Sequence, residues 1–361
     1  MNIAMIVMGN PYRTPYIKKY ASLVKASDEF TVLFWNRDGR SDKSSWQTRS
    51  FNYKLTDNSP QKKMMGYLHY RKFLIEQIDR NKYDLLIVSP TNAALLLSDV
   101  LIKRFSGRYV IDVRDYCHER LPLIRWTEKK LVAHAAQTVI SSDGYRAFLP
   151  ADGNYLVVHN VQSVEKAELK RRRAAREKRI PARLGCVGSI VYYSAYEALI
   201  NQFKDEERFT LSFIGHGSEV LEQYCTKHGI NNVVIQGAFP PEETTSKFSQ
   251  IDIVNGIYGA NHPSLDYALS NKLYLAAELG IPIVANKNTY MEKIARKYGI
   301  GIGINWMNKE SIDELFDYYM NLDYEVFDKN CDEFLQVVEE DNAKFEEVIS
   351  ALYEGDRIED D

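Results

Sequence analysis

Short runs of apolar residues alternate with longer amphipathic stretches along most of the chain. Residues 3–8 form the first apolar run, a Gly-Asn-Pro turn and a helical pattern follow, and residues 30–35 form the second run. Parallel strands need crossover connections, usually helices, so this alternation is typical of a parallel sheet covered by helices on both faces. The pattern predicts helices at residues 16–25, 60–80 and 93–103 and further strands at residues 83–89, 109–113, 139–141 and 156–160.

A basic stretch over residues 163–183 interrupts this alternation, and the lack of large aliphatic residues in its centre predicts a solvated helix or a linker. The alternation then restarts, with strands expected at residues 184–187, 210–214, 233–236, 251–254, 281–285 and 301–304. We therefore predict an α/β protein with two doubly wound, Rossmann-like domains, residues 1–162 and 184–320, joined by the basic linker 163–183. A helical tail, residues 321–361, is expected to return to the first domain and to end in disordered residues. A length of 361 residues fits two domains, and a single large barrel is the alternative.

Composition narrows the class of protein. Hydrophobic residues make up 45% of the chain and charged residues 26%, which is typical of a globular protein. A net charge of -3, from 46 basic and 49 acidic residues, gives no general attraction to nucleic acid, so no nucleic-acid partner is expected. The four cysteines lack metal-ligand spacing, which predicts neither zinc nor disulfides and favours a reducing cytoplasm. No apolar run approaches the roughly 20 residues of a spanning helix, so any membrane contact is expected to be peripheral.

Ligands of open parallel sheets bind beyond the carboxyl ends of the strands. In the second half of the chain, Gly188-Ser189 and Gly215-His216-Gly217-Ser218 each follow a predicted strand and precede a helix. Backbone amides at such turns can hold an anion, whereas the alternative is that the glycines only make tight turns. Neither turn fits GxGxxG or a P-loop, which disfavours a dinucleotide oxidoreductase and a P-loop NTPase.

A long polar loop over residues 258–272 precedes a helix that Gly280 ends. Ser270 or Asn271 is suited to cap that helix. Lys272 then falls in the first turn, where a cation opposes the helix dipole. A bound phosphate would explain a lysine there, and a solvated lysine tolerated at small cost is the alternative.

In the first half, a dense polar cluster, residues 112–119, follows a strand predicted to be fully buried. Charges in such a place must be paired or functional, and an Arg114–Asp115 ion pair with no catalytic role is the alternative to a site. His118 alone is weak evidence, because a loop histidine is often solvated. The basic, aromatic-rich helix at residues 60–80 suits contact with an anionic inner membrane leaflet, although its apolar face is also expected to pack on the sheet.

In their order along the chain, these features resemble a GT-B glycosyltransferase, most closely the bacterial retaining enzymes of family 4 type that build capsule or surface polysaccharides. The resemblance covers nearly the whole chain. The residues that carry it are 35–37, 112–115, 158–160, 188–189, 214–217, 236–237, 239–240, 242–243, 270–274 and 280–284.

The resemblance implies a UDP- or GDP-sugar bound in the C-terminal domain, a glycan or lipid-linked acceptor in the N-terminal domain, and a cleft between them. It implies retaining transfer of a hexosyl group without a cofactor or metal, in which the departing diphosphate takes the acceptor proton. The implied catalytic residues are Asp115, Arg114, His118, Glu119 and Lys272. The implied donor-binding residues are Gly188, Ser189, Gly215, His216, Gly237, Phe239, Asp266, Ser270, Asn271 and Lys272, and the implied acceptor-binding residues are Gly9, Asn10, Arg13 and Arg37.

The chain departs from the family pattern in two places. Family members usually carry a ribose-binding glutamate where this chain has Leu275, and often a basic residue in the turn that holds Ser189-Ile190-Val191 here. Two alternatives to an active transferase therefore stay open. One is a catalytically weak GT-B module that binds a nucleotide or a partner in a glycan assembly complex. The other is a sugar-nucleotide epimerase of the same fold, for which the sequence shows no extra acid/base carboxylates.

Overall fold

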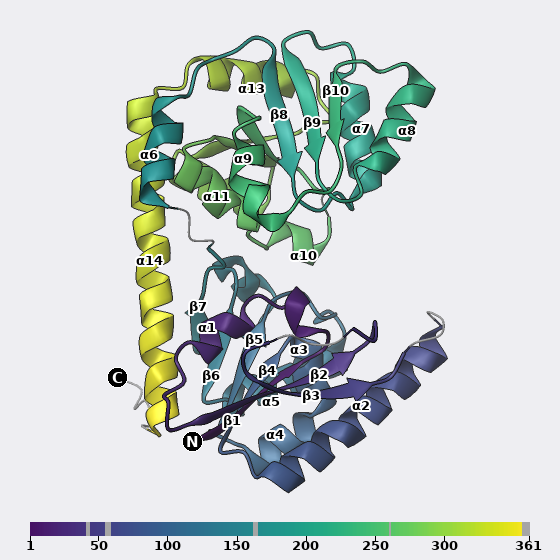
Figure 1. Cartoon of the computed structure of the whole chain (residues 1–361), viewed down its shortest axis with the longest axis vertical. Helices are drawn as coiled ribbons and strands as arrows, with labels where there is room; N and C mark the ends of the chain where they lie inside the picture. The colour runs from purple at the N-terminus through teal and green to yellow at the C-terminus, as the bar shows by residue number, and fades with distance from the viewer. Residues whose placement is uncertain (41–43, 55–58, 162–164, 260, 356–361) are drawn as a thin grey trace. The chain divides into compact units, whose positions relative to one another are not determined.

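A computed structural model describes residues 1–361 except 41–43, 55–58, 162–164, 260 and 356–361. The chain divides into two compact units (Figure 1). Unit 1 comprises residues 1–159 and 340–361, and unit 2 comprises residues 160–339. Each unit is built on one parallel sheet with helices on its faces, so the α/β, doubly wound prediction is confirmed.

The sheet of unit 1 has seven parallel strands in the order β3-β2-β1-β4-β5-β6-β7. Strands β1, β4 and β5 are almost wholly buried, as their continuous apolar sequences predict. The strands are β1 Asn2–Val7, β2 Glu29–Asn36, β3 Gln47–Asn52, β4 Leu85–Ser89, β5 Tyr109–Val113, β6 Gln137–Ile140 and β7 Tyr155–Val157.

Strand β3 is absent from the sequence prediction. Its sequence, QTRSFN, contains no apolar run, and its residues are exposed or only half-buried. It lies at the edge of the sheet, where one side of the strand needs no partner and polar residues are tolerated.

The helices of unit 1 are α1 Ile17–Ala21, α2 Pro60–Asn81, α3 Thr91–Leu96, α4 Ser98–Arg104 and α5 Pro122–His134, with single 3₁₀ turns at Pro11–Arg13 and Asp143–Ala147. The prediction of α2 is confirmed, whereas the helix expected at 93–103 is divided at Leu97 between α3 and α4. Helix α2 packs on the sheet through Tyr70, whose hydroxyl donates to the carbonyl of Val7 at 2.7 Å.

The sheet of unit 2 has six parallel strands in the order β10-β9-β8-β11-β12-β13. Its strands β8, β9 and β10 lie side by side in Figure 1. They are β8 Ala182–Val187, β9 Phe209–Ile214, β10 Val233–Gln236, β11 Ile253–Gly256, β12 Ile283–Asn286 and β13 Gly301–Ile304. Val187 pairs with Ile214, so the two glycines that follow these residues leave neighbouring strands at the same edge of the sheet.

Two apolar clusters cover the two faces of this sheet. One contains side chains of α7, α8 and α13, and the other contains side chains of α9, α11, α12 and α14. The helices of unit 2 are α6 Lys166–Ala174, α7 Tyr193–Phe203, α8 Glu219–His228, α9 Thr244–Phe248, α10 Pro263–Asp266, α11 Asn271–Leu279, α12 Tyr290–Lys297 and α13 Glu310–Met320, with a 3₁₀ turn at Pro241–Glu243.

Helix α14, Tyr324–Glu354, contributes to both units. In unit 2, Phe327 and Phe334 pack in the cluster that covers α11. In unit 1, Phe345 and Ile349 pack against residues of β1 and β2. The residues expected to be disordered at the end of the tail, 356–361, lie outside the described residues.

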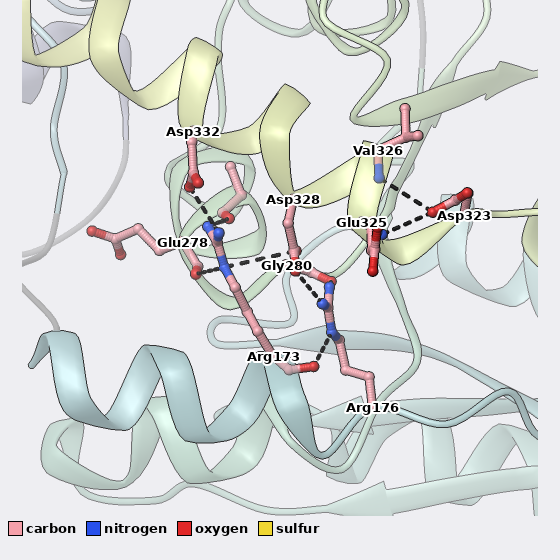
Figure 2. Close-up of polar contacts among 10 residues, drawn as sticks. Arg173, Arg176, Glu278, Gly280, Asp323, Glu325, Val326, Asp328 and Asp332 are labelled. Carbon is pink, nitrogen blue, oxygen red and sulfur yellow. Dashed lines mark hydrogen bonds and ion pairs between the residues drawn. The ribbon is translucent and has the colours of Figure 1, made fainter.

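The basic stretch was predicted to be a solvated helix or a linker, and residues 163–164 of it lie outside the described residues. The described part contains a helix, and its residues before Ala182 are exposed or half-buried. Residues 166–174 form α6, and Arg173 in this helix and Arg176 just after it bind the C-terminal end of α11 and acidic residues of α14 (Figure 2). Arg173 donates to the carbonyls of Ala277 and Glu278 and to Asp332. Arg176 donates to the carbonyl of Gly280 and to Asp328. The stretch is thus a packed part of unit 2, because long arginine side chains can satisfy a helix C-terminus without aliphatic burial.

Candidate functional site

The carboxyl edge of the unit 2 sheet brings two glycine turns into direct contact. Gly188 and Gly215 both adopt positive φ, 116° and 143°. A Cβ on Gly215 would lie 1.8 Å from the carbonyl oxygen of Gly188, and one on Gly217 would lie 2.4 Å from the carbonyl oxygen of Ile190. Glycine is therefore required at both positions by the close approach of the backbones.

The two turns differ in the amides that they leave open. The N–H of Gly188 donates to the carbonyl of Ile214, so the first open amide of that turn is that of exposed Ser189, for which no described residue is an acceptor. In the second turn, the N–H of Gly215 donates to the carbonyl of Gln236, and the N–H of Gly217 donates to its own neighbour Glu219. Each turn thus leaves one amide without a described acceptor, that of Ser189 in the first turn and that of His216 in the second.

Lys272 lies beside the first turn. Ser270 caps α11, its Oγ accepting from the N–H of Lys272 at 3.3 Å, which confirms Ser270 as a capping residue. The Lys272 Nζ lies 3.1 Å from the Sγ of Cys186, two residues before Gly188, and 4.8 Å from the ring centre of Tyr258. No described carboxylate lies within salt-bridge distance of this ammonium group. An ammonium without a counter-charge, next to an open amide and a helix N-terminus, is suited to bind phosphate.

Tyr258 and Cys186 are the site residues that sequence reasoning missed. Tyr258 holds Lys272 with its ring, while its hydroxyl is 2.9 Å from the Oγ of the cap residue Ser270. A second tyrosine, Tyr192, contacts the ring of Tyr258 at 5.4 Å between centres. The position of Tyr258 just after β11 could have identified it, because ligands bind beyond the carboxyl ends of strands. Nothing in the sequence distinguishes Cys186 from other buried strand residues.

Other predicted donor residues lie around this edge in different surroundings. Asp266 accepts from the N–H of Asn261 at 3.1 Å, and both residues line a cavity of about 570 Å³ that also contains Trp306. His216 is exposed. A Cβ on Gly237 would lie 3.1 Å from a carboxylate oxygen of Glu219. The ring centre of half-buried Phe239 lies 5.9 Å from the Nζ of Lys247. The open amide of Asn271 is at the first turn of α11, beside Lys272.

Leu275, where family members carry the ribose-binding glutamate, is part of the core. Only 5% of its surface is exposed, and it packs in the cluster of α11, α12 and α14. Glu278, further along the same helix, is also buried, and burial raises its pKa from 4.5 to about 7.

At the carboxyl edge of the unit 1 sheet, Arg114 pairs with Asp112 rather than with Asp115, the partner in the alternative to a functional site. Arg114 Nε lies 2.7 Å from a carboxylate oxygen of Asp112, and the guanidinium covers the ring of Tyr16 at 4.4 Å. Burial raises the pKa of the Asp112 carboxyl, and the adjacent guanidinium opposes that rise. Asp112 is fully buried near the end of a buried strand, so it needs a cation that the exposed Asp115 does not need.

The following loop is organised by Glu119. Both oxygens of its buried carboxylate accept from the N–H of Cys117, at 2.8 and 2.7 Å. His118, between them, is exposed and adopts a positive φ of 63°. Glu119 thus holds the loop that presents Asp115 and His118.

Of the four predicted acceptor residues, Asn10 and Arg37 are held by close contacts, whereas Arg13 and Gly9 lie in more open surroundings. Asn10 joins the ends of β1 and β2: its side-chain Nδ2 donates to Asn36 at 2.8 Å, and its side-chain Oδ1 accepts from the N–H of Arg37. The Arg37 guanidinium covers the ring of Trp35 at 4.4 Å. Arg13 is exposed and reaches Asp38 only at 3.9 Å, while a Cβ on Gly9 would meet open space.

Helix α2 exposes Met64, Met65 and Leu68, while its opposite face is buried. Within the described residues, no helix is long and apolar enough to cross a bilayer. The same residues contain no group of three or more His, Cys, Asp or Glu side chains placed to hold a metal ion.

No family model matches the chain, and no curated protein sequence does. Several solved structures resemble it over nearly its whole length. Sucrose-phosphate synthase from Thermosynechococcus elongatus is 11% identical, with a TM-score of 0.72 over 98% of this chain and 100% of its own. Anabaena HepE in complex with UDP and glucose is 14% identical, with a TM-score of 0.66 over 97% and 100%. The lipopolysaccharide outer core galactosyltransferase WaaB is 15% identical, with a TM-score of 0.65 over 97% and 99%. The fold of this chain is therefore GT-B.

Proposed function

We propose that the protein is a glycosyltransferase that takes a sugar from a UDP- or GDP-sugar bound in unit 2. The observation that carries the proposal is Lys272, a cation without a counter-charge beside the open amides of Ser189 and Asn271. The likeness of the fold to glycosyltransferases, including one that binds UDP, supports it.

In this proposal the diphosphate lies against Lys272 and the Ser189 turn, and the base lies near Gly237 and Phe239. Charge develops on the leaving diphosphate during transfer, so a fixed ammonium and backbone donors stabilise the transition state more than the ground state. These groups supply positive charge from the chain itself, and we propose a hexosyl transfer with retention and without a metal or other cofactor. Asp266 is the proposed ribose contact, since Leu275 has no polar atom to offer.

The acceptor is proposed to bind unit 1, at Asn10, Arg13 and Arg37 and at the loop that holds Asp115 and His118. We propose a glycan or lipid-linked acceptor of a surface polysaccharide such as a capsule, at the cytoplasmic side of the membrane. Arg114 and Glu119 act there by holding the loop, because their own charges are bound to Asp112 and to the Cys117 amide.

Calorimetric titration with UDP and GDP, together with an assay of sugar-nucleotide hydrolysis, tests the proposal. The wild type should bind one of the two and slowly hydrolyse the matching sugar nucleotide. Lys272→Ala should weaken binding by about tenfold or more, since a charge-assisted contact to phosphate contributes roughly 1.5–3 kcal/mol. Lys293→Ala, on the exposed side of α12 in the same unit, is the matched control. Wild-type affinity in Lys272→Ala would contradict the proposed donor site.

The burial of Leu275 favours a second candidate, a GT-B module that binds nucleotide without efficient transfer. The apolar side chain of Leu275 cannot hydrogen-bond to a ribose hydroxyl. A ribose hydroxyl left buried and unpaired would lower the binding free energy by about 1–3 kcal/mol. Nucleotide binding without hydrolysis or transfer would favour this candidate, and isomerisation of the sugar would favour an epimerase.

A peripheral membrane contact through α2 is also proposed. Met64, Met65 and Leu68 are exposed on a helix that carries Lys63 and Lys72, a combination suited to an anionic leaflet. Co-sedimentation with anionic vesicles should occur and should weaken with salt and with Leu68→Gln. Binding that is absent, or that salt leaves unchanged, would contradict it.

A further inference from the structure

A second cavity in unit 2 lies at the opposite edge of the sheet from Lys272. It has a volume of about 330 Å³, within the range of small-molecule sites. Arg183 at the start of β8, Asp252 before β11 and Pro282 before β12 line it, and all three mark the amino ends of parallel strands. The proposed donor site lies at the carboxyl ends of the same strands, so the two sites are separated by the length of the sheet.

Five arginines line this cavity, and only part of their donor capacity is used. Arg183 donates two hydrogen bonds to the carboxylate of Asp252, at 2.6 and 2.9 Å. Arg176 is held by Gly280 and Asp328 (Figure 2). Arg171 and Arg172 each donate one hydrogen bond to Glu168. A guanidinium carries five N–H donors, so these two retain several for a ligand.

Arg179 is the least engaged of the five. Its side chain is 50% exposed, and its guanidinium approaches Glu177 and Asp252 only at 3.9 and 4.0 Å, beyond hydrogen-bond distance. The cavity is lined by five arginines against Glu168, Glu177 and Asp252, so its lining carries an excess of positive charge.

The rest of the lining is apolar. Ile251, Leu279, Ile281 and Pro282 contribute to it, and the ring of Tyr324 lies under Arg176 at 4.5 Å. A cavity with an apolar wall and guanidinium donors matches a ligand that has one anionic group and one hydrocarbon part. We propose that this cavity binds a phosphate monoester with an apolar substituent, its phosphate on Arg179 and Arg171 and its hydrocarbon part on Leu279 and Ile281. The site is independent of the proposed donor site, whose function it does not require.

Calorimetric titration of the full chain with hexyl phosphate and with inorganic phosphate tests this site. Hexyl phosphate should bind more tightly than inorganic phosphate, because only the ester reaches the apolar wall. Arg179→Gln and Arg171→Gln should each weaken hexyl phosphate by about fivefold or more, as expected for loss of a charge-assisted contact. Both side chains are at least half exposed, so these variants should fold.

Two controls separate this site from others. Arg80→Gln removes the same charge from an exposed position of α2 in unit 1 and should bind like the wild type. Lys272→Ala should also retain hexyl phosphate, which shows that the ester does not occupy the proposed donor site. Failure of the donor proposal therefore leaves this test unaffected.

The source of the phosphate is tested with phosphatidylcholine vesicles with and without phosphatidic acid. Binding to the phosphatidic acid vesicles that Arg179→Gln reduces, alongside hexyl phosphate binding, would assign a lipid head group. Hexyl phosphate binding alone would assign a soluble ester. No binding of hexyl phosphate, equal affinity for inorganic phosphate, or wild-type affinity in both arginine variants would overturn the proposal.

Discussion

Arg114 in unit 1 and Lys272 in unit 2 are both cations at the carboxyl edge of a parallel sheet. They differ in whether a carboxylate lies next to the charge. Arg114 meets the carboxylate of Asp112 at 2.7 Å. Lys272 meets a sulfur atom and an aromatic ring. A buried charge that has its counter-charge is part of the fold, whereas one without it is poised for an external anion. We therefore propose a structural role for Arg114 and a binding role for Lys272.

Removal of the Asp112 carboxylate should have the largest effect, a loss of stability in unit 1. Asp112→Asn leaves Arg114 buried without its counter-charge, and loss of one partner of a buried pair costs about 3–5 kcal/mol. We expect unit 1 to lose roughly 3 kcal/mol of stability in urea unfolding. Asp115→Asn, an exposed neighbour, is the matched control and should change the free energy of unfolding little. Equal stability of Asp112→Asn and the wild type would mean that the pair does not support the fold.

Glu128 is a buried carboxyl group without a cationic partner among the described residues. It is 2% exposed, and no described residue bonds to its carboxyl oxygens. Burial, with Glu119 nearby, raises its pKa from 4.5 to about 8. Between these pH values the native state keeps a proton that the unfolded chain has released, so its contribution to stability falls as pH rises through this window.

Glu128→Gln removes this titration. We expect the variant to be more stable than the wild type by about 2 kcal/mol near pH 6 and by less than about 1 kcal/mol near pH 5, with the gap widening further toward pH 8. Urea unfolding across this pH range measures the difference, with Glu76→Gln on the exposed side of α2 as control. A gap that does not grow with pH would show that Glu128 titrates normally.

Lys272→Met tests whether this lysine contributes to nucleotide binding rather than to stability. Since the ammonium group has no counter-charge, its removal should leave the free energy of unfolding unchanged or slightly raised. UDP or GDP affinity should fall by about tenfold, or 1.4 kcal/mol. Calorimetry and urea unfolding on the same sample separate the two readouts, with Lys293→Met as control. A loss of stability like that of Asp112→Asn would place Lys272 with Arg114 as a structural cation.

Tyr258 gives the smallest expected effect. Its ring holds the ammonium through a cation–π contact, which contributes about 0.5–1 kcal/mol at exposed sites. Tyr258→Leu should weaken the nucleotide that binds by about threefold, whereas Tyr258→Phe retains the ring and should change its affinity less than twofold. Equal losses in both variants would assign the effect to the hydroxyl that contacts Ser270.

Local patterns in the sequence were enough to predict the two parallel sheets, helix α2, the cap at Ser270 and the glycine turns at 188 and 215. Each depends on residues close together in the chain, through hydrophobic periodicity or the φ that glycine permits. The polar edge strand β3 was missed because it has no periodicity of its own, and the helix at 93–103 was expected to be continuous because its apolar residues do not mark the break at Leu97.

Only the tertiary structure decided which charges meet. Lys272 and Cys186 are 86 residues apart, and they meet because β8 and β11 are neighbours in a strand order that no local pattern encodes. The arginines of the basic stretch look solvated by composition, yet Arg173 and Arg176 cap a helix about a hundred residues further along the chain. Even Arg114 has its partner two residues before it rather than next to it, because alternate residues of a strand share a face. Long side chains reach whichever partner the packing brings near, so their charge balance follows from topology rather than from composition.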